Sequence, residues 1–156
     1  MSKVTRATQA LDKAGVAYAV FTYDYDPDAD RIGVQAAESL GVDSGMVLKT
    51  LMAEVDGKPV CVLIRSDREV NMKKLAAAFR GKSAGMMTPA SAERATGYHV
   101  AGISPFGQKR GHPIAVDEAA LAADAVFVNG GQRGLQLRLA PPDLVKALGA
   151  LTAPLS

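Results

Sequence analysis

Two apolar runs joined by an Asp-Gly pair are the feature that most constrains the fold of this chain. The first run, MVLKTLMAEV, covers residues 46–55, and the second, PVCVLIR, covers residues 59–65. Asp56 and Gly57 fall between them, and Asp-Gly between two apolar runs predicts a β-hairpin with a tight turn. Successive side chains of a strand point to opposite faces, and both faces of the first run are mostly apolar. The sequence therefore predicts an interior strand paired with its successor.

Lys49 is the exception within the first strand and lies near its middle. Lysine side chains are seldom fully buried without a partner, because removing the ammonium group from water is costly. One interpretation is that the alkyl stem lies along apolar surface while the ammonium group reaches water. The other interpretation is a cationic group at the floor of a cleft. The strand pattern alone leaves both open.

Shorter patterns predict the elements around this hairpin. A capping threonine and a closing glycine bound a helix over 5–15. Because strands and helices follow without regular alternation, we expect an α/β (α+β) fold with a mixed, curled sheet surrounded by helices. The chain shows no internal repeat or linker, which indicates one domain over residues 1–156. The other predicted elements are helices over 33–41, 71–81, 89–97 and 141–150, strands over 16–23, 113–116, 125–130 and 135–140, a short strand before Pro89, and loops over 24–31 and 98–111.

The composition is that of an ordinary globular protein. Of the 156 residues, 48% are hydrophobic and 22% are charged, which suits one compact domain with a sizeable core. No apolar run is long enough to span a bilayer, and the N-terminal residues lack the apolar core of a signal peptide. We therefore expect a soluble, cytoplasmic protein with no membrane partner.

Several kinds of site lack the residues that they need. Cys61 is the single cysteine, so an intrachain disulfide is impossible, and its strand-like surroundings favour an inert buried thiol. With only His99 and His112 beside it, a zinc site of the Cys/His type has too few ligands, and we expect neither a metal nor a cofactor. No serine–histidine pair for nucleophilic catalysis stands out. The formal charge of +2 is too small to predict nucleic-acid binding by itself. Lys109 and Arg133 lie in stretches that could contact phosphate, but such basic residues more often belong to a solvated surface.

Four stretches, taken together, resemble a known family. They are FTYDYDPDAD at 21–30, VLKTL at 47–51, TGYHVAGISPFGQKR at 96–110 and VNGGQRGLQL at 128–137. In this order and spacing they resemble the YbaK/EbsC family of Cys-tRNA(Pro) deacylases, which is related to the editing domain inserted in many bacterial prolyl-tRNA synthetases. The resemblance covers nearly the whole chain. It implies the editing-domain fold of that family, a mixed and partly barrel-like β-sheet ringed by helices.

The resemblance also implies an activity. Members of the family are free-standing editing domains that remove cysteine wrongly attached to proline tRNA, and such a second sieve is useful because a synthetase pocket discriminates poorly between side chains of similar size. The implied chemistry is substrate-assisted, since the thiol of the substrate attacks its own carbonyl carbon and expels the tRNA hydroxyl. The expected partners are the acceptor end of Cys-tRNA(Pro) and, in a transient complex, prolyl-tRNA synthetase. Two alternatives stay open, namely deacylation of Ala-tRNA(Pro) or another small product by water, and a non-catalytic tRNA- or nucleotide-binding module.

The matching motifs supply the residues expected at the reaction centre. By resemblance, Lys49 is the essential lysine, and we expect its ammonium group to anchor the acceptor end of the tRNA through phosphate or sugar oxygens. A cation on a rigid strand is positioned better than one on a loop. The N–H groups of Gly102, Ile103 and Ser104 are expected to stabilise the oxyanion that forms at the ester carbonyl.

Further matching positions are expected to line a pocket for the aminoacyl–adenosine. Three of them depart from the family pattern. Ile32 stands where phenylalanine is frequent, Asn129 where serine is common and Gln136 where aspartate often follows, and these changes bear on pocket size and cysteine preference. The remaining expected pocket residues are Tyr23, Asp26, Thr50, Pro105, Gly130 and Gly131.

Overall fold

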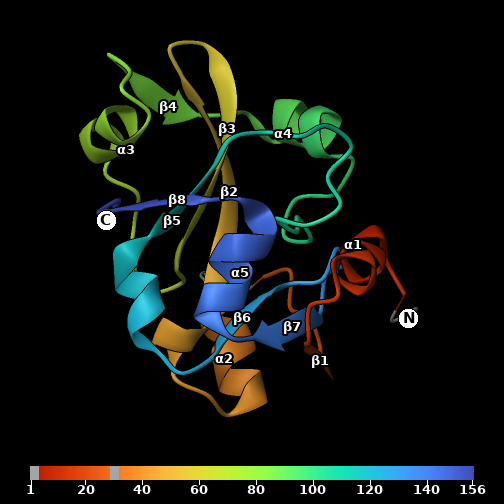
Figure 1. Ribbon diagram of the computed structural model, residues 1–156. Coiled ribbons are helices and arrows are strands. Elements are labelled where there is room, and N and C mark those ends of the chain that lie inside the picture. The colour runs from red at the N-terminus through yellow and green to blue at the C-terminus, as the bar shows by residue number, and fades with distance from the viewer. Residues whose placement is uncertain (1–3, 29–31) are drawn as a thin grey trace.

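Two β-sheets form the frame of the protein, whose computed structural model describes residues 4–28 and 32–156. The strands are β1 (Ala19–Thr22), β2 (Leu48–Val55), β3 (Lys58–Arg65), β4 (Ala84–Met86), β5 (Ile114–Asp117), β6 (Val126–Asn129), β7 (Leu135–Leu139) and β8 (Leu151–Ala153). One sheet has the order β4–β2–β3–β5–β8 and the other has the order β1–β7–β6 (Figure 1). β3 with β5 and β5 with β8 are parallel pairs, whereas the other pairs are antiparallel. The predicted mixed sheet is confirmed.

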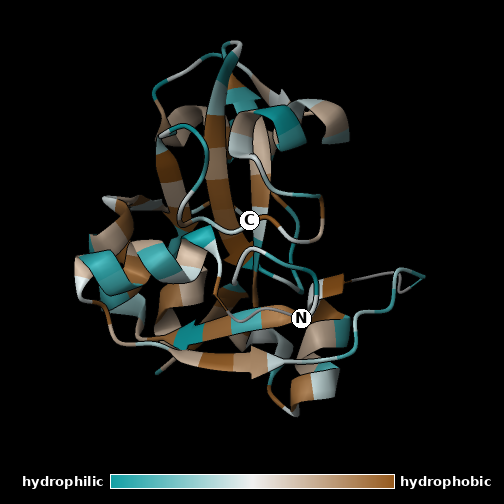
Figure 2. Ribbon diagram, turned by 90° about the vertical axis from the view of Figure 1, so that its right-hand side faces the viewer, coloured by the Kyte–Doolittle hydropathy of each residue, from teal (hydrophilic) through white to brown (hydrophobic). Residues whose placement is uncertain are grey.

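The predicted hairpin forms the centre of the larger sheet. β2 and β3 pair antiparallel along their whole lengths and end with Val55 opposite Lys58. Asp56 and Gly57 make the turn with φ angles of 50° and 81°. This left-handed backbone is what a two-residue hairpin turn of type I′ requires, and Asp-Gly adopts it readily. Figure 2 shows hydrophobic colour along most of both strands, as expected for strands covered on two faces.

The two sheets meet beside the start of β2. Val47 forms an isolated parallel bridge with Phe127 of β6. Phe127 is buried and packs edge-on against Phe21 of β1, with 5.3 Å between the ring centroids. Because the described strands continue from one sheet toward the other without closing, the structure is barrel-like only in a loose sense. One core cluster, which includes Leu63 and Leu137, takes residues from both sheets.

Helices surround the sheets and begin within one residue of the predicted positions, whereas the helix predicted over 71–81 ends three residues early. The helices are α1 (Arg6–Ala14), α2 (Ile32–Leu40), α3 (Met72–Ala78), α4 (Pro89–Thr96) and α5 (Pro141–Leu148). The Thr5 hydroxyl caps α1 by accepting the Thr8 N–H, and Gly15 ends this helix with a φ of 71°. In Figure 1, α3 and α4 lie near the turn of the β2–β3 hairpin, while α2 and the three-stranded sheet lie toward the opposite end.

Two strand starts differ from the prediction by two residues or more, and one strand was not predicted. β1 begins at Ala19 rather than at residue 16, because the Val16 N–H is still used to close the end of α1. β2 begins at residue 48, because Ser44–Met46 forms a short 3₁₀ turn before it. β8 was not predicted. It has three residues and depends on parallel pairing with β5, which a local pattern does not reveal.

Part of the predicted loop over 24–31, namely residues 29–31, lies outside the described residues. Within the described ranges, no helix is long and apolar enough to cross a membrane. The same ranges contain no group of three or more His, Cys, Asp or Glu residues that could hold a metal ion.

Candidate active site

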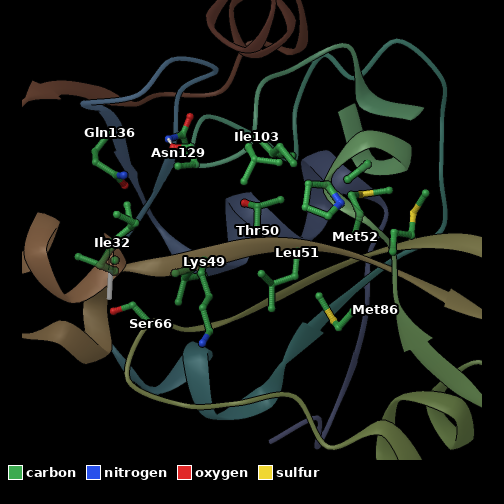
Figure 3. Close-up of a pocket in the computed structure, with 18 of the residues that line it drawn as sticks. Ile32, Lys49, Thr50, Leu51, Met52, Ser66, Met86, Ile103, Asn129 and Gln136 are labelled. Atoms are coloured by element: carbon green, nitrogen blue, oxygen red, sulfur yellow. Dashed lines mark hydrogen bonds between the residues drawn. The ribbon is translucent and has the colours of Figure 1, made fainter. Parts of the chain in front are cut away.

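A cavity of about 380 Å³ opens along the edge of β2, near the place where the two sheets meet (Figure 3). Figure 3 shows Gln136 and Asn129 at one end of this cavity and Met52 and Met86 at the other. One end is therefore polar, and the other is apolar and rich in methionine, a side chain that adapts to irregular shapes. Seven of the predicted site residues line the cavity: Tyr23, Ile32, Lys49, Thr50, Ile103, Asn129 and Gln136.

The edge of β2 that faces the cavity is open at its centre. β4 pairs with β2 only from Ala53 to Val55, and the Met52 carbonyl accepts the Met87 N–H at 3.1 Å. At the other end, Val47 is bridged to β6. Thr50 lies between these contacts, and its one strand partner among the described residues is on β3. Because backbone groups of a strand alternate between its two edges, the Thr50 N–H and C=O point toward the open edge.

Three buried polar atoms of the cavity wall have no hydrogen-bond partner within the described part of the chain. They are the Tyr23 hydroxyl, the Thr50 hydroxyl and the Gln136 amide oxygen. Burial raises the pKa of Tyr23, an effect that the neighbouring Gln136 side chain partly opposes, so the hydroxyl stays protonated and able to donate. Buried polar groups are normally paired, and unpaired ones at a cavity indicate that a polar ligand completes them.

Lys49 and Thr50 leave β2 on opposite sides. Figure 3 shows Lys49 on one side of the strand and Thr50 on the side of Ile103, so the cavity wraps around the open edge. The Lys49 side chain is 23% exposed, and its ammonium group lies 3.3 Å from a Glu69 carboxylate oxygen. The structure thus combines both interpretations of this lysine, with a largely covered stem and a charged head at the cavity. Glu69 was not predicted, because it lies in a polar turn whose sequence gives no signal of this pairing.

The loop over 98–111 supplies a second wall. The Gly102 N–H donates to the His99 carbonyl at 2.8 Å, so this predicted oxyanion donor is already in use. A Cβ atom at Gly102 would lie 3.1 Å from the Arg133 backbone nitrogen, which explains the glycine as a point of close approach between this loop and the 130–134 turn. The N–H groups of Ile103 and Ser104 have no partner among the described residues.

Asn129 joins this loop to the glycine turn. Its amide nitrogen donates to the Ala101 carbonyl at 3.1 Å, and its amide oxygen accepts the Gly131 N–H at 2.7 Å. Although Asn129 lines the cavity, both ends of its side chain are therefore engaged within the protein.

Six predicted site residues lie outside the cavity lining. Asp26 is exposed, and its carboxylate accepts the Asp28 N–H at 2.9 Å. The Ser104 side chain is fully buried and accepts the Phe106 N–H at 3.2 Å, so its hydroxyl is engaged within the protein. The other residues outside the lining are Gly102, Pro105, Gly130 and Gly131.

The cysteine and the histidines are not part of the cavity wall. Cys61 is completely buried on β3, and burial raises the pKa of its thiol to about 12, as expected for an inert thiol. The His99 side chain is 88% exposed. His112 lies 2.8 Å from the Gln108 amide oxygen, and burial, followed by the Arg110 charge, lowers its pKa. None of these three residues lines the cavity.

Comparisons with known proteins show the family to which this chain belongs. The sequence profile described as the aminoacyl-tRNA editing domain matches residues 26–147. The chain belongs to the aminoacyl-tRNA editing domain family. A relative in Enterococcus faecalis, the provisionally named Cys-tRNA(Pro)/Cys-tRNA(Cys) deacylase EbsC, is 35% identical over 140 residues, covering 88% of this chain and 84% of that protein.

Two further proteins that are similar to this chain have names that refer to prolyl-tRNA synthetase. The proline–tRNA ligase of Acidithiobacillus ferrooxidans is 34% identical over 91 residues, which cover 58% of this chain and 16% of the ligase. The crystal structure of a provisionally named trans-editing enzyme for prolyl-tRNA synthetase superposes with a TM-score of 0.84 at 23% identity and covers 100% of this chain and 98% of that chain. At this identity the likeness concerns the fold, and it agrees with the predicted editing-domain architecture.

Proposed function

We propose that this protein is a trans-editing deacylase that removes cysteine from mischarged Cys-tRNA(Pro). The observation that supports it best is one cavity that combines a strand lysine, an open strand edge at Thr50 and Ile103, whose N–H group has no partner among the described residues. These groups suit an aminoacyl ester, which has a carbonyl oxygen, an amino group and a neighbouring ribose phosphate. The provisional name of the EbsC relative points to the same class of substrate.

The chemistry that we propose uses the thiol of the substrate. Its sulfur attacks the ester carbonyl carbon, a C–S bond forms, and the C–O bond to the ribose of the terminal adenosine breaks. The thiol proton goes to the departing ribose oxygen, and a cyclic thiolactone leaves and later hydrolyses in water. The N–H groups of Ile103 and Ser104 would hold the negative charge on the carbonyl oxygen, an effect often worth about 100-fold in rate for a single donor.

Lys49 has the role of an anchor in this scheme. Its ammonium group exchanges Glu69 for a phosphate or sugar oxygen of the acceptor end when the tRNA binds. Because the aminoacyl site contacts little of the tRNA, choice among tRNAs requires more surface than this cavity provides. We therefore propose a transient cytoplasmic complex with prolyl-tRNA synthetase, and equal deacylation of Cys-tRNA(Pro) and Cys-tRNA(Cys) with and without the synthetase would contradict it.

A second candidate is a broader sieve that hydrolyses Ala-tRNA(Pro) or another small aminoacyl ester with water. The methionine-rich end of the cavity favours it, because three flexible methionines, Met52, Met86 and Met87, line this end and adapt to different side chains. Alanine has no thiol, so this reaction requires an attacking water in place of the substrate sulfur.

The test is deacylation of Cys-tRNA(Pro) and Ala-tRNA(Pro) by the wild type and by Lys49→Ala. We expect loss of the cysteinyl ester with the wild type, little loss of the alanyl ester, and a fall in kcat/KM of at least about 100-fold in the variant. Lys58→Ala is the matched control, because Lys58 is an exposed strand lysine that does not line the cavity. Equal loss of both esters favours the water reaction, and loss of neither favours a tRNA-binding module without catalysis.

A further inference from the structure

An arginine–tyrosine pair lies beside the polar end of the cavity. The Arg133 guanidinium carbon is 5.4 Å from the centre of the Tyr25 ring, and the Arg133 Nε donates to the Val100 carbonyl at 2.9 Å. Val100 itself lines the cavity and is 36% exposed. Two contacts thus hold the guanidinium group in place at the rim.

Chain connectivity puts this pair at the polar end. Arg133 belongs to the turn that connects Asn129 with Gln136, and both of these residues line the cavity. Tyr25 follows two residues after Tyr23, another lining residue, and packs against the same small core cluster as Tyr23. Tyr25 is half-buried, whereas Arg133 is exposed, so the ring supports the arginine from below.

The charge of Arg133 is partly offset by a neighbour. Glu93 accepts the Val100 N–H at 2.9 Å, and this hydrogen bond, with smaller effects from His99 and the Arg133 charge, lowers the pKa of the Glu93 carboxyl. An ionised carboxylate close to Arg133 weakens its attraction for phosphate. The planar face of the guanidinium group is unaffected, and arginine planes and aromatic rings are the surfaces on which unpaired bases stack.

We propose that Tyr25 and Arg133 form a stacking platform for one base of a single-stranded 3′ nucleotide end, next to the nucleotide whose aminoacyl ester enters the cavity. This inference rests on the proposed function for the identity of the strand. A guanidinium group already held by Tyr25 and Val100 loses little conformational freedom when a base lands on it. Arg133 would then help to direct the terminal nucleotide toward the cavity, without taking part in the chemistry.

The first test measures stacking without any deacylation. The probe is a single-stranded RNA without an attached amino acid that ends in CCA and carries 2-aminopurine in place of the penultimate base. The fluorescence of 2-aminopurine falls when it stacks. We expect quenching with the wild type, and a Kd raised about 10-fold with little quenching in Arg133→Lys, because lysine keeps the charge but has no planar face. The matched control is Arg138→Lys, since Arg138 lies 5.0 Å over the Phe21 ring and neither residue lines the cavity.

Binding and quenching by Arg133→Lys equal to those of the wild type would overturn the platform, because a point charge would then suffice. Thermal unfolding of both variants verifies that they fold.

A second measurement separates this inference from the proposed function. With mischarged tRNA we expect Arg133→Lys to raise KM, while kcat/KM for cysteinyl-adenosine, which lacks the penultimate nucleotide, stays unchanged. If the wild type quenches the probe but deacylates no substrate, the proposed function is contradicted and the platform is supported. If Arg133→Lys is active and its KM for mischarged tRNA is unchanged, the platform is contradicted and the proposed function is supported.

Discussion

At the residue scale, the cavity holds polar groups that the folded protein leaves without partners. The hydroxyls of Tyr23 and Thr50 and the Gln136 amide oxygen are buried and unpaired among the described residues. Each such group costs about 1–3 kcal/mol of stability in the free protein. Binding sites commonly keep groups of this kind because the ligand completes them, so activity and stability are expected to respond in opposite directions when one is removed.

Thr50→Val tests whether activity and stability change in opposite directions. Valine keeps the shape of threonine and removes the unpaired hydroxyl, so we expect the free energy of unfolding to stay equal or to rise by up to about 1 kcal/mol. We expect kcat/KM for Cys-tRNA(Pro) to fall about 10-fold, because the substrate loses a hydrogen-bond partner. Urea unfolding and deacylation kinetics measure the two effects. Thr50→Ser, which keeps the hydroxyl, is the control, and full activity of the valine variant would show that the hydroxyl does not contact substrate.

At the scale of elements, the loop over 98–111 has no helix or strand and is held by side-chain hydrogen bonds, both within the loop and from β6. The Tyr98 hydroxyl donates to the Phe106 carbonyl at 2.6 Å, and the Gln108 amide nitrogen donates to the Ser104 carbonyl at 3.0 Å. Asn129, at the end of β6, fixes the same loop from the other side. The position of the Ile103 and Ser104 N–H groups therefore depends on contacts within the loop and on the contact from Asn129.

Asn129→Asp tests whether this contact positions the loop. Aspartate keeps an oxygen for the Gly131 N–H but has no donor for the Ala101 carbonyl. We expect kcat to fall about 10-fold with KM near the wild-type value, because donors displaced by a fraction of an ångström stabilise the transition state less well. Faster amide exchange at Ile103 would accompany the fall. Asn129→Ala removes both contacts and is expected to lose more, so wild-type kcat in both variants would contradict the positioning role.

At the scale of the whole molecule, stability depends on titratable groups buried in the core, and Cys61 and Tyr98 belong to one core cluster. Cys61 is completely buried on β3, and burial raises its pKa from an ordinary 9.0 to about 12. A group whose folded pKa is raised gives stability that is present below the unfolded pKa and is lost as the pH rises toward the folded pKa. Tyr98 behaves in the same way, since burial raises its pKa from 10.0 to about 12.

Alkaline unfolding is the corresponding prediction. Above the ordinary pKa of 9.0, the unfolded chain releases the Cys61 proton and the folded chain retains it. The free energy of unfolding should then fall by about 1.4 kcal/mol per pH unit for this one group. In Cys61→Ala, the free energy of unfolding should fall less steeply with pH from the ordinary cysteine pKa upward. In Tyr98→Phe, the fall should become less steep only from about one pH unit higher. Urea unfolding at a series of alkaline pH values measures both, and an unchanged slope in the alanine variant would contradict the assignment.

The sequence by itself determined the features that depend on local chemistry. Asp56 and Gly57 fix the hairpin because a tight turn needs their left-handed backbone, and Thr5 with Gly15 fixes α1 because caps act within one helical turn. The four stretches at 21–30, 47–51, 96–110 and 128–137 led to the editing family and to seven residues that line the cavity. These features can be predicted from the sequence because the interacting groups are neighbours along the chain or belong to a shared motif.

The tertiary structure alone decided the features that join distant residues. Glu69 meets Lys49 across 20 positions, and Arg133 meets Val100 across 33, so no local pattern reports either contact. The open edge at Thr50 exists because β4 ends its pairing with β2 at Ala53, and register depends on the packed sheet. The residue types thus predicted which chemical groups were present. The packing of separate elements decided which of these groups are hydrogen-bonded within the protein and which are free to bind a ligand.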